Sequence, residues 1–387
     1  MRVFLYWRLT CSPKILIKAG VINHKQARWW HELLIKGLGE FFYKNQIDFT
    51  SKDFVAIKPV DLLLQKKSLA KVAGDKILIP VGGGKDSVVS LKILTDLHNG
   101  KTGAFLLNPT KESLKMVEIT GVQEKIICEH FVDKKLKFME EKGFLTGHFP
   151  YTAYLHFLSV LCAVVFGYKN VAFSNEKSSD EANTVYLGRK INHQYSKSFE
   201  FERKFRLYNQ KYLSEVNVFS FLRPLYEFQI VKMFSKMPEY FSLVRSCNVM
   251  AAQDKSGWCG GCSKCLSIYI LLYPFLDKKN LERIFSNDFF KNKNFLPLAK
   301  ALAVLEGVKP FDCVATKKEV RLALYLCFLK EKRLSKISPF LKACLDHKVI
   351  SKHYSSDTIA QVFRNYDNNN FLPSRDRKAL KDLSLTL

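Results

Sequence analysis

The stretch from residue 76 to residue 94, KILIPVGGGKDSVVSLKIL, constrains the fold of this chain more than any other. Its apolar start, residues 77–81, is typical of a buried parallel strand, and its apolar end predicts a helix. Three glycines, Gly82, Gly83 and Gly84, stand between the two. A strand that turns through glycines into a helix forms a phosphate site, because the backbone can approach the anion and the N–H groups at the helix start attract it.

Three polar residues follow the glycines: Lys85, Asp86 and Ser87. Lys85 adds a positive charge and Ser87 a hydroxyl donor, and both suit a phosphate. The loop is not a Walker A motif, because position 79 is Ile and Asp86 follows the lysine. It is not a dinucleotide-binding GxGxxG either, because Ser87 occupies the last glycine position. We predict a nucleotide-binding loop of another class, with an ordinary glycine-rich turn as the alternative.

Residues 71–275 alternate predicted strands and helices, which favours an α/β domain with a doubly wound parallel sheet. The expected strands are Ile77–Val81, Ala104–Leu107, Lys125–Cys128, Asn170–Ser174 and Val216–Phe221, and the expected helices are Ser87–Leu97, Glu112–Thr120, Lys134–Lys142, Tyr151–Phe166 and Glu227–Lys236. Residues 1–70 form a smaller N-terminal accessory domain, in which His31–Phe49 is expected to be a helix and then a strand. Residues 276–387 are expected to be helical and to end in a lightly packed tail from Asp367 onward.

One segment has the length of a membrane span, because Tyr151–Tyr168 contains no Asp, Glu, Lys or Arg. It begins directly after Pro150 and contains His156 and Ser159. The predicted site residues on either side of it must share one pocket, which a span would prevent. We therefore expect a helix buried within the α/β domain.

The composition limits the kinds of partner and the cellular compartment that we expect. The net charge is +25, from 61 Lys plus Arg against 36 Asp plus Glu. This charge suits a polyanionic partner such as RNA, a nucleotide or a nucleotide-sugar, or it is simply a lysine-rich surface. Ten cysteines in a chain of 387 residues do not suggest a disulfide scaffold, and the N-terminus lacks a signal-peptide layout. We expect a cytoplasmic protein.

A polar segment follows the predicted strand Asn170–Ser174 directly, and it reads SNEKSSDEANTVYLGRKINHQYSKSFEFE. In a parallel sheet, ligands bind beyond the carboxyl ends of the strands, where the glycine loop would also lie. We therefore favour a site here over a solvated loop. Carboxylates suit the Mg²⁺ that accompanies ATP, and the candidates are Glu176, Asp180 and Glu181.

Four cysteines have the spacing of a metal site: Cys247, Cys259, Cys262 and Cys265, the last three in WCGGCSKC. Four thiolates on two tight turns can surround one tetrahedral Zn²⁺, and such a closed site is structural. Reduced thiols near a redox site are the alternative. Cys313, in KPFDCVAT, is interpreted as a buried thiol, with a catalytic thiol as the alternative.

GGGKDS resembles the SGGxDS loop of the pyrophosphate-loop ATP pyrophosphatases, although Gly82 replaces the usual serine. Members such as 7-cyano-7-deazaguanine synthase carry a similar four-cysteine zinc site. A narrower resemblance covers most of the chain. GLGEFFYKNQIDF, PVGGGKDS, SNEKSSDEAN, NHQYSKSFEFE, WCGGCSKC and KPFDCVAT together resemble the UDP-N-acetylmuramoyl-L-alanyl-L-glutamate epimerases, within the pyrophosphate-loop (HUP-like) superfamily.

That resemblance implies an isomerase that inverts the terminal L-glutamate of UDP-MurNAc-L-Ala-L-Glu for peptidoglycan synthesis, with ATP and Mg²⁺, and releases AMP. It also implies three sets of site residues. The catalytic candidates are His193, Tyr195, Lys197 and Glu181. The ATP-binding candidates are Gly82, Gly83, Gly84, Lys85, Asp86, Ser87, Asn175 and Glu176. The substrate-binding candidates are Asn183, Gln194 and Glu200.

Two other classes of function are weaker alternatives. A tRNA-modifying pyrophosphate-loop enzyme would fit the charge and the cysteines, but we recognise no RNA-binding module, and that class leaves NHQYSKSFEFE without a role. A non-catalytic nucleotide-binding protein would fit Gly82, but the presence of Lys85, Asp86 and Ser87 argues against it.

Overall fold

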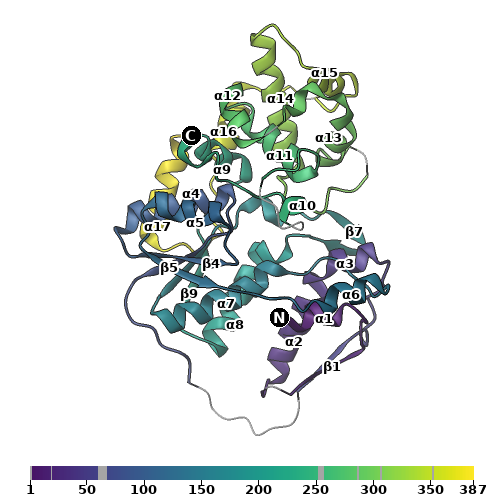
Figure 1. The fold of residues 1–387 in the computed structure, drawn as a ribbon, viewed down its shortest axis with the longest axis vertical. Coiled ribbons are helices and arrows are strands. Elements are labelled where there is room, and N and C mark those ends of the chain that lie inside the picture. The colour runs from purple at the N-terminus through teal and green to yellow at the C-terminus, as the bar shows by residue number, and fades with distance from the viewer. Residues whose placement is uncertain are drawn as a thin grey trace.

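The computed structural model describes residues 2–18, 20–59, 68–251, 257–285, 287–305, 307–350 and 353–387. Residues 60–67, near the end of the predicted N-terminal domain 1–70, lie outside the described residues. Figure 1 shows the parallel sheet in the middle of the molecule, the N-terminal elements at its lower end and a helical group at its upper end.

A five-stranded parallel sheet forms the centre of the fold, in the order β5-β4-β3-β6-β9. Its strands are β3 (Ile77–Pro80), β4 (Thr102–Leu107), β5 (Glu124–Cys128), β6 (Asn170–Phe173) and β9 (Asn217–Ser220). These are the five strands expected from the sequence, so the predicted parallel α/β sheet is confirmed. The chain runs from β3 outward to β5 and then returns to β6 on the other side of β3. The connections that follow β3 and β6 therefore diverge, and such a switch point is where open α/β sheets bind ligands.

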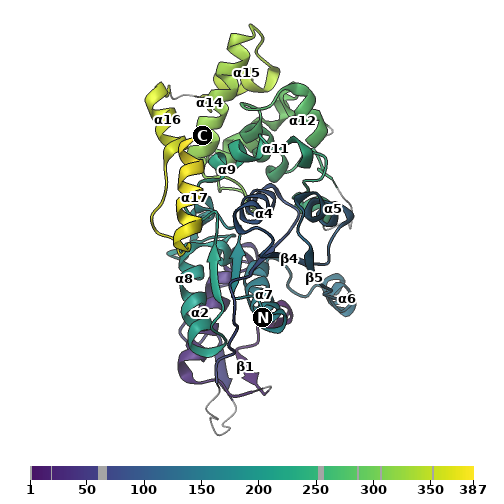
Figure 2. The ribbon, with the colours of Figure 1, turned by 90° about the vertical axis from the view of Figure 1, so that its left-hand side faces the viewer.

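Side chains of β3 alternate between two hydrophobic cores. Ile77 and Ile79 pack in the core on one face, and Leu78 packs in the core on the other. The first face carries α4 (Lys85–His98), α5 (Lys111–Thr120) and α9 (Glu227–Phe234), and the second carries α7 (Tyr151–Phe166) and α8 (Phe199–Tyr212). Figure 2 shows α4 and α5 on one side of the strands and α7 and α8 on the other. Both faces of the sheet are thus covered.

Helix α7 packs one side against the sheet and exposes the other. His156 and Ala163 are fully buried, whereas Val165 is 64% exposed. No helix in the described part of the chain is long and apolar enough to cross a membrane. The predicted helix is therefore present, but it is only partly buried.

The N-terminal elements pack against the second face of the sheet, because Leu34 and Phe41 belong to the same core as Leu78. They are α1 (Arg2–Trp7), β1 (Lys14–Ile17), α2 (His24–Gly37), α3 (Gly39–Lys44) and β2 (Ala56–Pro59), and β1 pairs with β2 in parallel. The prediction of a strand at the end of His31–Phe49 is wrong, because α3 occupies the first residues of that strand. Phe41 and Phe42 are adjacent and both fully buried, and the alternating sides of a half-buried strand do not allow this.

The polar segment after β6 contains a hairpin of β7 (Thr184–Tyr186) and β8 (Arg189–Ile191) and then enters α8, a helix absent from those expected from the sequence. Phe201, Phe205 and Tyr208 are buried at helical spacing on one face of α8. The many charged residues between them obscured this pattern.

The upper helical group confirms that the last third of the chain is mainly helical. Its elements are α10 (Asn248–Ala251), α11 (Ser263–Leu272), α12 (Lys278–Ile284), α13 (Leu296–Leu302), α14 (Lys317–Arg333), α15 (Pro339–Asp346) and α16 (Ser356–Arg364). A short helix α6 (Lys135–Glu141) lies between β5 and α7.

The prediction of a lightly packed tail from Asp367 onward is wrong, because α17 (Ser374–Leu385) packs against α4. Leu380 is fully buried, and the Asp376 carboxylate lies 2.6 Å from His98 Nε2. Apolar burial and a buried polar contact together hold the last helix in place.

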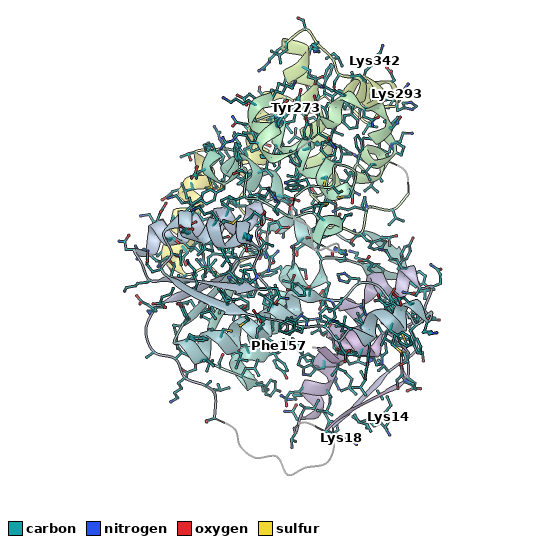
Figure 3. The ribbon with its side chains drawn as sticks, viewed as in Figure 1. Lys14, Lys18, Phe157, Tyr273, Lys293 and Lys342 are labelled. Carbon is teal, nitrogen blue, oxygen red and sulfur yellow. The ribbon has the colours of Figure 1, made fainter. Side chains whose placement is uncertain are left out.

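Lysines are spread over the molecule. Lys14 and Lys18 are exposed at the lower end, and Lys293 and Lys342 are exposed at the upper end (Figure 3). Part of the net charge therefore lies far from the central sheet.

Candidate active site

The glycine loop joins the end of β3 to the start of α4. Gly83 has a φ of +79°, which only glycine adopts readily, and Gly84 is the N-cap of the helix. The Ser87 hydroxyl donates to the Gly84 carbonyl at 2.8 Å. A Cβ atom built on Gly82 would have no atom within 4 Å. The loop therefore has the backbone expected of an anion site, with open space beside Gly82.

Lys85 is buried among carboxylates at the first turn of α4. Its Nζ atom lies 2.6 Å from Asp86 and 2.9 Å from Glu227 at the start of α9. Burial disfavours the ammonium charge, but Asp86, Glu227 and Glu176 outweigh this effect and raise the pKa of Lys85 above its ordinary value. Lys264 lies 3.5 Å from the same Glu227 carboxylate. The loop lysine is thus held in a fixed, charged state.

Two residues directly after β6 are buried near this group. The side chain of Asn175 donates to the Ser220 hydroxyl of β9 at 3.1 Å. Burial and the nearby Asp86 carboxylate raise the pKa of Glu176 to about 7, although Lys197 opposes the shift. Glu176 thus lies close to the glycine loop, whereas the Asn175 side chain is hydrogen-bonded to the sheet.

A second group of ionisable side chains surrounds Cys313, which is partly exposed between α13 and α14. The Lys197 ammonium donates to the Cys313 Sγ atom at 3.4 Å. His193 also hydrogen-bonds to the thiol, and its Nδ1 atom contacts the Glu40 carboxylate of α3. Glu40, His193, Cys313 and Lys197 therefore form one continuous cluster from three distant segments of the chain.

The charges of this cluster stabilise one another. Burial opposes charge on His193, but hydrogen bonds to Cys313 and Glu40 raise the pKa of His193 to about 9. Burial would raise the pKa of Cys313, but Lys197 and His193 lower it to about 6. His148, whose Nδ1 atom lies 3.4 Å from Glu40, has a pKa lowered to about 3 by burial and by the neighbouring His193. At neutral pH the arrangement favours a thiolate beside an imidazolium.

Glu40, His148 and His193 also bring potential metal-ligating atoms within 4.8 Å of one another. Glu40 already contacts His193 directly as a hydrogen-bond partner. We therefore interpret these three residues as a proton-sharing group.

Glu181 and Asn183 connect the polar segment to the KPFDCVAT stretch. Glu181 pairs with Lys309 at 2.7 Å, and the Asn183 side chain donates to the Pro310 carbonyl at 2.7 Å. Asn183 also accepts from the backbone N–H of His193 at 2.8 Å. These contacts bring two sequence motifs together around Cys313.

The other predicted site residues lie in a different environment. The Tyr195 ring packs in the core with Phe201, and Lys36 lies 5.8 Å from the ring centroid. Glu200 pairs with Lys36 at 2.5 Å and with Lys204 at 2.6 Å. Gln194 is buried, and its Oε1 atom has no partner among the described residues. The structure thus brings His193 and Lys197 to Cys313, but it does not bring Tyr195 or Glu200 there.

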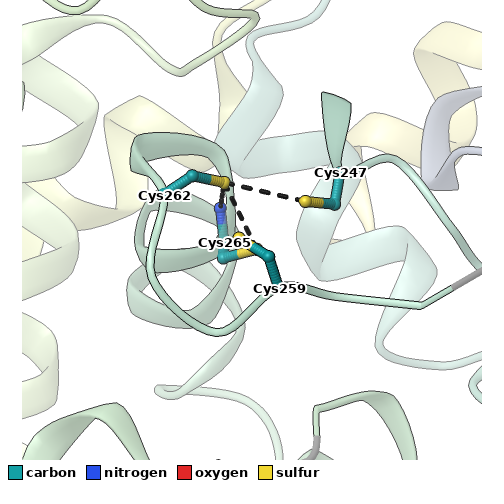
Figure 4. Close-up of side chains that lie close together, drawn as sticks. All are labelled: Cys247, Cys259, Cys262 and Cys265. Carbon is teal, nitrogen blue, oxygen red and sulfur yellow. Dashed lines mark hydrogen bonds between the residues drawn. The ribbon is translucent and has the colours of Figure 1, made fainter. Parts of the chain in front are cut away.

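The four predicted metal-ligating cysteines converge on one point (Figure 4). Their Sγ atoms are 3.8 Å apart for Cys247 and Cys262, 3.7 Å for Cys259 and Cys265, and 3.4 Å for Cys262 and Cys265. Four convergent thiols are the donor set of a structural Zn²⁺ site. The geometry of the side chains therefore fits the ion that the spacing predicts.

This cysteine cluster adjoins both groups described above. The N–H of Arg245, two residues before Cys247, donates to the Gly83 carbonyl at 2.9 Å. Ser263, next to Cys262, donates to Asp312 at 3.0 Å, and Asp312 accepts from the backbone N–H of Cys313 at 2.9 Å. The cluster therefore supports the glycine loop on one side and the Cys313 segment on the other.

The sequence motifs do not indicate Glu40, His148, Glu227 or Lys264 as members of these groups. Glu40 carried one usable signal, because a carboxylate within the aromatic run GLGEFFYK is expected to be buried and paired. Glu227 and Lys264 carried none, since their partners lie far away in the sequence.

Three curated relatives resemble this chain over most of its length, and each is named UDP-N-acetyl-alpha-D-muramoyl-L-alanyl-L-glutamate epimerase. The protein of Xanthomonas oryzae pv. oryzae is 29% identical over 82% of this chain and 71% of its own length. The protein of a Micromonospora species is 30% identical over 91% of this chain and 78% of its own length. The protein of Salinispora tropica is 31% identical over 87% of this chain and 73% of its own length.

Two family models also match. The MurL N-terminal domain matches residues 3–221, which include the glycine loop and His193, and the MurL C-terminal domain matches residues 243–355, which include the cysteine cluster and Cys313. With more than half of the chain matched and relatives of about 30% identity, this protein belongs to the MurL family.

Proposed function

We propose that this protein is an ATP- and Mg²⁺-dependent epimerase that converts the terminal L-glutamate of UDP-MurNAc-L-Ala-L-Glu to D-glutamate in peptidoglycan precursor synthesis. The observation that carries the proposal is the shared name of the three relatives, which match 82% to 91% of this chain. The adjoining phosphate-type loop and acid–base cluster support it, because an activated epimerisation requires both.

The chemistry begins with activation of a carboxylate. The hydrogen α to a carboxylate is very weakly acidic, because its carbanion would adjoin a negative charge. In the proposed first step, a carboxylate oxygen of the glutamate attacks the α-phosphorus of ATP and pyrophosphate leaves. The resulting acyl-adenylate has lost the carboxylate charge and accepts electrons better. Loss of the α-proton and its return on the other face give the D form, and hydrolysis then releases AMP.

We assign the glycine loop, Lys85 and Ser87 to the phosphates of ATP, within a fold of the pyrophosphate-loop (HUP-like) type. Preorganised donors and a fixed cation stabilise the charge that develops on the phosphoryl oxygens. Asp86 and Glu176 would hold Mg²⁺, which neutralises phosphate charge when it is bound. The buried Glu176 carboxylate interacts electrostatically with the half-buried Asp86 carboxylate, and two neighbouring carboxylates suit such a cation.

We assign His193 and Lys197 to the proton-transfer side of the site. Glu181 and Asn183 would position the segment that carries these two residues, through Lys309 and Pro310. The unpartnered Oε1 atom of buried Gln194 is available to a substrate donor. Tyr195, Glu200 and Asn175 receive no catalytic role, because each is engaged elsewhere.

We further propose that the four-cysteine cluster holds a structural zinc ion and that the protein works in the cytoplasm. All ten cysteines are free thiols, which suits a reducing compartment. With four protein ligands the metal would have no open position, so it would brace the site and take no part in the chemistry.

The test is incubation of the purified protein with ATP, Mg²⁺ and UDP-MurNAc-L-Ala-L-Glu. Acid hydrolysis and chiral chromatography would then measure D-glutamate, and a coupled assay would measure AMP. UDP-MurNAc-L-Ala, which lacks the glutamate, is the matched substrate control. Folded protein that yields neither D-glutamate nor substrate-dependent AMP would refute the proposal.

A further inference from the structure

Cys313 lies at the centre of the cluster that it forms with Glu40, His193 and Lys197. Its Sγ atom accepts from the Lys197 ammonium at 3.4 Å and is hydrogen-bonded to His193. Its backbone N–H donates to Asp312 at 2.9 Å, and its carbonyl oxygen accepts from Lys264. The backbone of this cysteine is thus fixed on both sides, and its sulfur lies between two cationic groups.

The histidine beside this thiol is held in one orientation. Its Nδ1 atom contacts the Glu40 carboxylate, and the same ring is hydrogen-bonded to the thiol. Glu40 is 4% exposed, and its own pKa is lowered to about 2 because the hydrogen bond and the charge of His193 outweigh its burial. A carboxylate that orients an imidazole, which in turn activates a thiol, is the arrangement found around reactive cysteines.

Lys197 connects the thiol to the phosphate side of the site. Besides its hydrogen bond to Cys313, its ammonium interacts electrostatically with the Glu176 and Asp86 carboxylates. A carboxyl group activated at the phosphate side would have its α-carbon one bond away from the reacting carbonyl. Within the described part of the chain, Cys313 is the cysteine whose sulfur accepts a hydrogen bond from a lysine of this cluster.

We propose that the Cys313 thiolate is the base that removes the α-proton of the activated glutamyl residue, an inference that rests on the proposed function. In this step the Cα–H bond breaks, an S–H bond forms, and the electron pair of the C–H bond moves onto the adenylated carbonyl group as an enolate. Water supplies the proton that reaches the opposite face of the α-carbon. The thiol then returns its proton to water, so the balance of atoms and charge is closed.

The remaining members of the cluster have positioning roles. Lys197 and the His193 imidazolium keep the sulfur anionic and in place before it takes the proton, and Glu40 fixes the ring of His193. Burial alone would raise the pKa of Cys313, but these two cations, together with Lys264, lower it and favour the ionised thiol at neutral pH.

The experiment separates the two halves of the reaction in Cys313→Ser. Substrate-dependent exchange of labelled pyrophosphate into ATP reports adenylation, and deuterium uptake at the α-carbon in D₂O reports proton removal. We expect Cys313→Ser to keep pyrophosphate exchange within about threefold of the wild type and to lose α-deuteration by at least ~100-fold. Cys11→Ser, which removes a half-buried thiol outside the site, is the matched control.

The outcomes distinguish this inference from the proposed function. Wild-type protein without substrate-dependent pyrophosphate exchange would refute the adenylation proposal itself. If Cys313→Ser retains α-deuteration, the cysteine is not the base. Loss of both partial reactions in a folded Cys313→Ser protein would place the thiol in adenylation and overturn the inference. A substrate thioester on Cys313 in acid-quenched wild-type protein would also overturn it, because the thiolate would then be a nucleophile.

Discussion

The Nζ atom of Lys197 lies 3.4 Å from the Sγ atom of Cys313, although 116 residues separate them in the chain. This contact joins the polar segment after β6 to the loop before α14. It also links a side chain near the phosphate-type loop to the thiol in the acid–base cluster. The charge state of the thiol therefore depends on this contact and on the residues that hold its two ends.

The pH dependence of activity should be bell-shaped. Lys197 and His193 lower the pKa of Cys313 to about 6, so the thiolate forms as the pH rises through that value. Cys313 and Glu40 raise the pKa of His193 to about 9, so the imidazolium is lost as the pH rises through that value. We expect kcat/KM to rise through the first value and fall through the second, as measured by initial rates of D-glutamate formation.

Lys197→Met tests the acid limb of that profile. Removal of the ammonium should move the acid limb to higher pH, because the thiolate loses a stabilising cation. Lys115→Met, which removes an exposed lysine on α5 that pairs with Glu118 at 3.2 Å, should leave the profile unchanged. An acid limb at the same pH in Lys197→Met would contradict the assignment.

Glu40→Gln should lower kcat by about tenfold or more, because the neutral amide no longer favours the imidazolium and orients it less strongly. The pKa of His193 should fall with the loss of the carboxylate, so the alkaline limb of the profile should move to lower pH. A merely structural role for Glu40 would lower the melting temperature without moving this limb. Glu118→Gln, in an exposed ion pair, is the control substitution.

Gly82 and Gly83 should respond differently to a side chain. Gly82→Ser should leave the melting temperature unchanged, because its Cβ would meet no atom within 4 Å, and its hydroxyl would restore a donor to the loop. Gly83→Ala should cost about 1 kcal/mol of unfolding free energy, because its φ of +79° disfavours a side chain. Thermal unfolding measures the change in stability of each variant, and the KM for ATP measures the effect of the restored donor. Equal destabilisation by the two substitutions would show that the loop differs from this description.

The cysteine cluster should bind about one zinc ion per chain, as measured by metal analysis of purified protein. Cys262→Ser should lose the metal and lower both the melting temperature and the rate, because the cluster supports the Gly83 and Asp312 contacts. Cys11→Ser should retain the metal. Retention of zinc and of full stability in Cys262→Ser would contradict the thiolate site.

Much of the fold could be predicted from local patterns. The five strands of the central sheet are short apolar runs with helices between most of them, and hydrophobic burial acts directly on such runs. Hydrophobic periodicity does not predict elements in which buried residues stand among charged ones. Helix α8 carries Phe201, Phe205 and Tyr208 among charged residues, and α3 buries Glu40 between apolar neighbours. Helix α17 depends on partners in α4, which no local pattern reveals.

The candidate site could be predicted only in part. The glycine loop and the cysteine cluster are contiguous or nearly so, and their chemistry depends on spacing along the chain. The polar segment itself indicates His193 and Lys197 as site residues, but the sequence around their partner Cys313 favours a buried thiol, with a catalytic thiol as the alternative. The cations that lower its pKa come from another segment, so the sequence around Cys313 does not reveal its charge state.

Local sequence patterns indicate the strands and helices of the α/β domain, the phosphate-type loop and the spacing of the four cysteines, because each pattern can be recognised within a short stretch of the chain. The tertiary structure alone decided which distant side chains share one site. Glu40, His193, Lys197 and Cys313 meet because the N-terminal helices pack on one face of the sheet and the loop before α14 reaches the polar segment. Charge states depend on distances through space, and only the folded chain sets those distances.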